Sequence, residues 1–159
     1  MYLNKINLFL VISICLIFFF LTYFDVKSQE LKIVDGDTIH LNSEKIRFTG
    51  IDTPELKQTC IKDNEIIQCG IKAKELLIKR IGNSKVNCIK EGKDRYGRIL
   101  AECFIGNVSL SRYLVRNGYA FAYRKYSQKF IPDENFARTN KNGMWSMKFE
   151  FPWDYRKKN

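Results

Sequence analysis

The sequence predicts an α+β domain, in which short strands come first and amphipathic helices close the chain. Two patterns lead to this prediction. Residues 31–49 alternate apolar and polar positions around turn signals, and residues 71–81 repeat apolar positions at helical spacing. The length of 159 residues leaves room for one domain of ordinary size. The sequence contains no internal repeat and no low-complexity linker.

The first 28 residues differ from this domain in hydropathy. Residues 6–24 form an uncharged, mostly apolar run of 19 residues. This run is longer than the roughly 7–15 residues of a usual export-signal core and close to the roughly 20 that span a bilayer. A cleaved signal and a retained anchor both remain open. We expect residues 1–28 to be a signal peptide or membrane anchor and residues 29–159 to be an exported domain, secreted, periplasmic or tethered to the membrane by residues 6–24.

The expected domain is strongly basic. Residues 29–159 hold 25 of the 27 Lys and Arg and 16 of the 17 Asp and Glu, a net charge of +9. Such a surplus favours polyanionic partners, either nucleic acid or an anionic membrane, although a solvated basic surface is the plainer alternative. A membrane-resting protein would need lysines clustered after the apolar run. Residues 25–41 have two lysines against four acidic residues, so we expect membrane contact only through the N-terminal segment.

Turn residues divide the first half of the domain into strands. Asp35-Gly36-Asp37 lies between apolar stretches, and residues 42–44 form the next turn before a strand at residues 45–48. The Thr53-Pro54 pair ends the strand region, because a residue before proline is held extended. Residues 56–70 are polar and are expected to be irregular.

Helices and one further hairpin fill the second half. Gly118 and Pro132 are typical of a helix end and of a helix start, respectively. The first helix is predicted at residues 71–81 by its apolar spacing. Gly118 ends a second helix at residues 110–117, and Pro132 begins a third at residues 132–141. Strands at residues 85–90 and 98–104 flank a turn at residues 94–97. The tail at residues 152–156 is expected to pack an aromatic pair on the domain.

The expected domain contains four cysteines, Cys60, Cys69, Cys88 and Cys103. An even number behind an export signal predicts two disulfides in an oxidising compartment. A Cys60–Cys69 bridge would close the polar loop. If the hairpin is centred on the 95–96 peptide, Cys88 and Cys103 lie opposite each other and can pair.

Zinc binding and histidine catalysis are both disfavoured. Zinc sites use closely spaced ligand pairs, whereas the cysteines here are separated by eight or more residues. His40 is the only histidine, and we expect it to be a packing or surface residue of a strand. Most acid–base schemes that depend on histidine are therefore excluded.

The residues that could perform chemistry are carboxylates and arginines beside turns: Asp35, Asp37, Asp52, Glu55, Arg47 and Arg98. Carboxylates on irregular backbone suit hard cations such as Ca²⁺, and guanidinium groups suit phosphate. Phosphodiester hydrolysis needs a base for the attacking water and positive groups for the charge that develops on phosphorus oxygens. Each fragment alone is more often a simple turn or an ion pair.

Four blocks together carry a family resemblance: Val34–Thr38 (VDGDT), Arg47–Glu55 (RFTGIDTPE), Asp94–Arg98 (DRYGR) and Leu114–Ala120 (LVRNGYA). In this order and spacing the chain resembles the staphylococcal nuclease (thermonuclease) family from about residue 31 to Trp145. The resemblance implies a five-stranded oligonucleotide-binding (OB) β-barrel with three α-helices. It also implies a monomeric, calcium-dependent endonuclease or phosphodiesterase acting on DNA and RNA.

The same resemblance assigns roles to individual residues. Asp37, Asp52 and the Thr53 carbonyl would bind Ca²⁺, and Glu55 would be the general base or the residue that positions water. Arg47 and Arg98 would hold the reacting phosphate. The expected contacts with the rest of the substrate are Arg95 and Tyr96 near its terminal phosphate and Tyr123, or else Tyr126, stacked on a base.

Two features depart from the best-known member of that family. The segment between Gly118 and Trp145 is shorter, and the cysteine pairs and the 152–156 tail resemble those of exported bacterial relatives. An alternative function is a catalytically silent OB module that only binds nucleic acid. Such a module would keep a basic groove and stacking aromatics but would have no reason to keep two metal carboxylates, a base and two arginines together.

Overall fold

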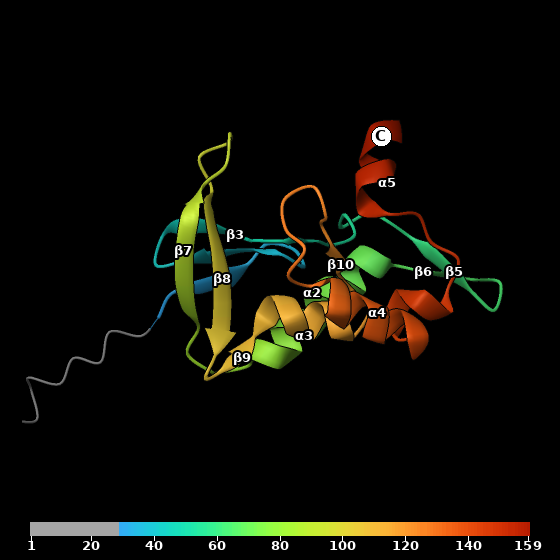
Figure 1. The fold of residues 1–159 in the computed structure, drawn as a ribbon, viewed down its shortest axis with the longest axis horizontal. Helices are drawn as coiled ribbons and strands as arrows, with labels where there is room; N and C mark the ends of the chain where they lie inside the picture. Colours follow the sequence, from blue (N-terminus) through green and yellow to red (C-terminus); the bar gives the residue numbers. More distant parts are fainter. Residues whose placement is uncertain (1–28) are drawn as a thin grey trace, which may run out of the picture.

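A computed structural model describes residues 29–159 as an α+β fold in which a mixed sheet packs against helices (Figure 1). The signal or anchor predicted for residues 1–28 lies outside the described residues. Within residues 29–159, every helix is too short or too polar to cross a membrane.

The main sheet contains six strands: β1 (Leu31–Ile33), β2 (Thr38–Leu41), β3 (Glu44–Phe48), β7 (Asn87–Lys93), β8 (Ile99–Ile105) and β9 (Val108–Ser109). Its order is β1-β2-β3-β8-β7, with β9 paired to β8. The β3–β8 pair is parallel and the other pairs are antiparallel. The sheet is therefore mixed.

The sheet does not close into the predicted five-stranded barrel. In the part of the chain that the structure describes, no ladder joins β7 to β1. Instead, the side-chain amide of Gln29 bridges the seam: its nitrogen donates to the Val86 carbonyl at 2.6 Å, and its oxygen accepts from the Val86 N–H at 2.8 Å. With only three residues in β1, one side chain supplies the hydrogen bonds that a longer edge strand would provide.

Two hairpins of the main sheet follow the sequence prediction with small shifts. The β2–β3 turn contains Asn42 and Ser43, both with positive φ, as a tight two-residue hairpin turn requires. Glu44 is already part of β3 and not of the turn. In the β7–β8 hairpin, Cys88 lies opposite Cys103 as predicted, and a bulge between Lys90 and Gly92 shifts the register further along.

The region predicted to be irregular contains a third hairpin, β5 (Cys60–Lys62) and β6 (Glu65–Ile67). Its turn residues, Asp63 and Asn64, have positive φ. The Cys60–Cys69 disulfide ties this hairpin to the next helix, and a second disulfide joins Cys88 to Cys103. The remaining strand pair, β4 (Ile51–Asp52) with β10 (Phe121–Ala122), has only two residues in each strand.

The described chain has four α-helices, α2 (Cys69–Ile81), α3 (Leu110–Arg116), α4 (Ile131–Thr139) and α5 (Pro152–Lys158), and a 3₁₀ turn, η1 (Gly143–Ser146). The first three correspond to the predicted helices, although α2 begins two residues earlier. The fourth was not predicted. Figure 1 shows α5 apart from the group formed by α2, α3 and α4.

Two apolar clusters hold these elements together. The larger cluster fills the space between the sheet and α2 and α3, with residues such as Ile46, Phe48 and Leu77 fully buried. The smaller cluster surrounds Phe121, whose ring lies 5.0 Å from that of Phe151, centroid to centroid. Trp153 of the tail joins this second cluster with Phe149 and Phe151, whereas Tyr155 is not part of it. The tail is therefore docked on the domain, with one aromatic residue in the cluster and not the predicted pair.

Candidate active site

The site begins at Asp37, which lies in the tight segment before β2 and is fully buried. Its backbone N–H donates to the Asp35 carboxylate at 3.0 Å, which fixes the turn. One Asp37 oxygen, Oδ2, accepts from the N–H and the hydroxyl of Thr53 at 2.9 and 2.8 Å. The other oxygen, Oδ1, pairs with Nη1 of Arg47. Asp37 therefore joins its own turn to β3 and to the segment after β4.

Arg47 bridges two of the buried carboxylates. It lies on β3 opposite Thr38 of β2, so its guanidinium reaches the start of β2. Its Nη1 bonds Asp37, and its Nη2 bonds Oδ1 of Asp52 at 2.7 Å. The Arg47 side chain is 17% exposed and Asp52 is fully buried. This ion pair has little contact with water.

Asp52 and Thr53 are positioned by β4 and by close backbone packing. Asp52 lies opposite Phe121 in the β4–β10 pair. A Cβ atom on Gly36 would lie 2.9 Å from the Thr53 hydroxyl oxygen, so the loop that carries Asp37 can approach Thr53 this closely only with glycine at that position. The sheet and this contact thus bring the Asp-Gly-Asp and Asp-Thr-Pro-Glu motifs together.

Glu55 follows directly, in a turn held by Gln58, a residue that the sequence analysis did not single out. Gln58 is fully buried, and its Oε1 accepts from the Glu55 N–H at 3.2 Å while its Nε2 donates to the Glu150 carbonyl at 2.7 Å. A Cβ on Gly70 would lie only 1.8 Å from the Glu55 carbonyl oxygen, so α2 packs tightly against this turn. The Glu55 side chain itself is 42% exposed.

The fifth member of the site is Arg156 of α5, which the sequence analysis also missed. Its Nη2 lies 2.7 Å from Oδ2 of Asp52, and its Nη1 lies 3.1 Å from Oδ1 of Asp52 and 2.8 Å from Oε1 of Glu55. The only sequence signal was the position of this arginine in the aromatic tail. We call Asp37, Arg47, Asp52, Glu55 and Arg156 the carboxylate centre.

Burial and charge shift the pKa values of Asp52, Arg47 and Arg156 in this centre and of the neighbouring Asp35. Burial, followed by the negative charge of Asp37, raises the pKa of Asp35 to about 6. Burial also raises the pKa of Asp52, although hydrogen bonding from Arg156 opposes the change. Burial alone would lower the pKa of Arg47 and of Arg156, but their carboxylate partners raise both above the ordinary value. Both arginines therefore remain cations.

The family resemblance implied that Arg98 would hold the reacting phosphate together with Arg47, but within the described residues Arg98 makes no hydrogen bond or ion pair to the carboxylate centre. Its Nε donates to Asp94 at 2.7 Å within the same turn. Its guanidinium carbon lies 5.6 Å from the centroid of the Tyr96 ring, and that of Arg95 lies 4.7 Å from it. The physical reason is proximity, because Asp94 is only four residues away. We call Asp94–Arg98 the hairpin turn.

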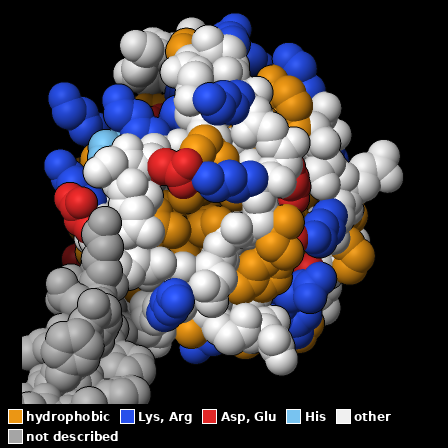
Figure 2. Space-filling model, turned by 90° about the vertical axis from the view of Figure 1, so that its left-hand side faces the viewer, with side chains coloured by type: hydrophobic (Ala, Val, Ile, Leu, Met, Phe, Trp, Pro, Cys, Tyr) orange, Lys and Arg blue, Asp and Glu red, His pale blue; other side chains and the backbone are white. Residues whose placement is uncertain are grey.

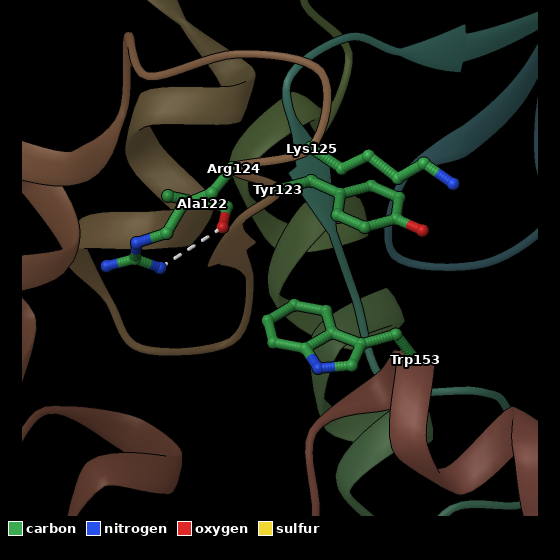
Figure 3. Close-up of a pocket in the computed structure, with 5 residues that line it drawn as sticks. All are labelled: Ala122, Tyr123, Arg124, Lys125 and Trp153. Atoms are coloured by element: carbon green, nitrogen blue, oxygen red, sulfur yellow. Dashed lines mark hydrogen bonds between the residues drawn. The ribbon is translucent and has the colours of Figure 1, made fainter.

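The predicted base-stacking residue, Tyr123, lines an open cavity of about 220 Å³ together with Ala122, Arg124, Lys125 and Trp153 (Figure 3). The Tyr123 and Trp153 rings are parallel within 5°, with centroids 5.7 Å apart. The guanidinium of Arg124 points away from Trp153 in Figure 3. Tyr126, the alternative stacking residue, packs edge-on against Tyr123.

The carboxylate and carbonyl oxygens of the site are ligands of the chemical type that a hard cation prefers. Asp37, Asp52, Glu55 and the Thr53 carbonyl offer only oxygen atoms, which Ca²⁺ prefers. In the described part of the chain, however, no group of three or more Asp, Glu, His or Cys side chains stands ready to hold a metal ion. Arg47 and Arg156 already occupy carboxylate oxygens of the three acidic residues.

The chain as a whole is basic. The face drawn in Figure 2 carries scattered Lys and Arg side chains around a hydrophobic area near its middle. Together with the net charge of +10 on the chain, this surface would attract a polyanion over distances comparable to the Debye length.

The fold and the site define a class: a small basic α+β domain with buried carboxylates and arginines suited to phosphodiester chemistry. A family model described as "Staphylococcal nuclease homologue" matches residues 45–147, well over half of the chain. The chain belongs to the staphylococcal nuclease family, which places it among the nucleases, enzymes that hydrolyse phosphodiester bonds. The same membership supports the OB type of fold despite the open seam.

Individual relatives agree with the family. An uncharacterized protein of Methanocaldococcus jannaschii is 33% identical over 144 residues, covering 73% of this chain and 70% of its own length. A thermonuclease of Staphylococcus hyicus is 32% identical over 128 residues, covering 73% of each chain. A probable staphylococcal-like nuclease of rice is 27% identical over 140 residues, and the match covers 86% of this chain but only 36% of the rice protein.

Proposed function

We propose that this chain is a calcium-dependent nuclease that hydrolyses phosphodiester bonds of DNA, RNA or both. The observation that supports this most strongly is the convergence of Asp37, Arg47, Asp52 and Glu55 from the β2, β3 and β4 regions into one network. A domain that only bound nucleic acid would have no use for three carboxylates in the centre, because they repel phosphate.

Glu55 is the proposed general base. It is the most exposed carboxylate of the centre, with 42% of its side chain accessible, whereas Asp37 and Asp52 are buried. A water molecule that attacks phosphorus must lose a proton, and an accessible carboxylate can accept it. The Gln58 hydrogen bond to the Glu55 backbone holds this turn in place.

Arg47 is the proposed phosphate-binding arginine of the centre. A guanidinium group has five N–H donors, and the two carboxylates use one bond each from Nη1 and Nη2. The remaining donors can bind phosphate oxygens and stabilise the charge that develops in the transition state.

Arg98 is the second proposed phosphate ligand, and the sheet register supports this role. Leu100 lies beside Arg47 in the parallel β3–β8 pair. Arg98 is two residues before Leu100, so its side chain starts on the same face of the sheet as that of Arg47. A phosphate bound beside Arg47 would then compete with Asp94 for the Arg98 guanidinium.

Calcium would be held by Asp37, Asp52 and the Thr53 carbonyl. A bound Ca²⁺ would supply positive charge to the phosphate oxygens as their negative charge grows. We also propose that Arg95, Tyr96 and Tyr123 bind the rest of the substrate. The exposed Tyr96 ring, stacked with Arg95, and the cavity beside Tyr123 support this assignment.

Digestion assays test the proposed function directly. The full chain, purified in mild detergent, is incubated with single- and double-stranded DNA and RNA, with calcium or with excess chelator. We expect cleavage with calcium and none with chelator. Binding without cleavage would favour the silent OB module, and undiminished cleavage in chelator would contradict the metal role.

We further propose that the chain is exported, with residues 1–28 as a signal peptide or anchor, and that it acts as a monomer. The two disulfides support export, because such bonds persist in oxidising compartments. Mass spectrometry of the protein recovered from its host would show residues 1–28 removed or retained, and gel filtration would report its size. Recovery of the intact chain from the reducing cytosol with free thiols would contradict export.

A further inference from the structure

The last helix, α5, places the positively charged side chain of Arg156 in the carboxylate centre. Arg156 makes three hydrogen bonds to Asp52 and Glu55, at 2.7, 3.1 and 2.8 Å. It thereby contacts both oxygens of Asp52 and one oxygen of Glu55. α5 lies beyond residues 45–147, the part that matches the staphylococcal nuclease model.

This placement is fixed by more than the ion pair. Trp153 stacks on Phe151, with ring centroids 4.7 Å apart, and lies parallel to Tyr123 (Figure 3). Trp153 and Arg156 are three residues apart on one helix, so both point toward the domain from the same face. The aromatic packing therefore holds α5 where its arginine reaches the carboxylates.

Arg156 and a divalent cation require the same oxygen atoms. A carboxylate oxygen that ligates Ca²⁺ approaches it to about 2.3–2.6 Å, and a guanidinium bonded to both oxygens of Asp52 blocks that approach. A divalent cation at Asp52 would also repel the guanidinium groups of Arg47 and Arg156 that already share this carboxylate, because burial reduces screening by water. Asp52 is fully buried.

We propose that Arg156 is a built-in competitor of the divalent cation: it neutralises Asp52 and Glu55 in the cation-free protein and must leave them when the cation binds. This inference rests on the proposed calcium role of Asp52. It assigns the tail a function in setting cation affinity, beyond its packing.

Calorimetric titration of Ca²⁺ into the full chain in detergent tests the inference without measuring cleavage. Arg156→Gln removes the charge, while Asp52 keeps Arg47 as its partner at 2.7 Å, so the variant is expected to fold. Arg156→Lys keeps a charge but cannot contact both oxygens in parallel. Lys157→Ala is the matched control, because Lys157 pairs with Asp154 on the exposed side of α5.

We expect Arg156→Gln to bind Ca²⁺ at least tenfold more tightly than the wild type, Arg156→Lys to be intermediate, and Lys157→Ala to match the wild type. Circular dichroism checks that each variant is folded, and Arg156→Lys provides the comparison if Arg156→Gln is not. If both Arg156 variants bind Ca²⁺ as weakly as the wild type or more weakly, the inference is overturned while the proposed calcium role of Asp52 still stands. Absence of calcium binding in every protein would overturn the inference together with the proposed calcium role.

Discussion

Arginine meets carboxylate under different conditions in the carboxylate centre and in the hairpin turn. In the carboxylate centre, the 17% exposed Arg47 bridges fully buried Asp52 and nearly fully buried Asp37, which come from other strands and loops. In the hairpin turn, the 30% exposed Arg98 pairs with Asp94 four residues earlier. The first network needs the β2–β3 hairpin and the following β4 segment to be in place. The second is a contact within one turn that can be exchanged for another anion.

The difference leads to separate expectations for stability and activity. Residues of the carboxylate centre should affect both, because removing one leaves a buried charge without its partner. Residues of the hairpin turn should affect activity with little change in stability, because water replaces a lost surface partner.

The largest expected effect is that of Arg47→Ala. This change leaves Asp37 and Asp52 without the guanidinium that joins them, and loss of one partner of a buried ion pair costs about 3–5 kcal/mol. Urea unfolding would measure the free energy of unfolding. A change below about 1 kcal/mol would show that the centre is better hydrated than its burial indicates.

Arg98→Ala is expected to lower the cleavage rate by about a hundredfold, since one stabiliser of the transition state is lost. Its melting temperature should stay close to that of the wild type. Cleavage kinetics and thermal unfolding test the two halves of this prediction, with Lys93→Ala, an exposed residue of β7, as control. A strongly destabilised Arg98→Ala would remove the distinction between the two regions.

The smallest expected effect is that of Asp94→Asn. Partial burial would raise the pKa of Asp94, but hydrogen bonds from Arg98 and the Tyr96 backbone lower it below the ordinary 3.8. A lowered pKa stabilises the fold above pH 3.8, and this contribution is lost as the pH falls through the folded-state value. We expect a loss below about 1 kcal/mol at neutral pH that disappears in strong acid. Urea unfolding of the wild type and Asp94→Asn at neutral pH and in strong acid measures this loss of stability. An equal loss under both conditions would show that it does not come from the ionised Asp94 carboxylate.

Local sequence patterns predicted much of the fold. The spacing of Ala73, Leu76, Leu77 and Ile81 predicted α2; Leu76 is half-buried and the other three positions are buried. The centre of the hairpin turn predicted the Cys88–Cys103 register. In both cases the relevant partners lie within about 15 residues, so periodicity and turn residues contain the information.

The features that the sequence did not predict depend on distant partners or on weak patterns. Arg156 and Asp52 are 104 residues apart, and Gln58 reaches Glu150 across 92 residues. No periodicity encodes such contacts. The β5–β6 hairpin was missed because its strands have three residues each and are mostly exposed. The seam bridged by Gln29 depends on one side chain 57 residues from its partner.

Family motifs predicted four of the five residues of the carboxylate centre but not its charge balance. Asp37, Arg47, Asp52 and Glu55 do meet, as the motifs implied. The motifs end before α5, so they contain no information on Arg156. The motifs also assign Arg98 to the phosphate, but they do not predict that Arg98 pairs with Asp94. That pairing is a property of the local turn.

The central claim is that Glu55 in the carboxylate centre activates the attacking water. The most direct measurement is the cleavage rate of a labelled oligonucleotide in saturating calcium by the wild type, Glu55→Gln and the control Glu75→Gln, which changes an exposed glutamate of α2. We predict that Glu55→Gln lowers the rate by about a hundredfold and that Glu75→Gln leaves it unchanged. Cleavage by folded Glu55→Gln at the wild-type rate would contradict the account.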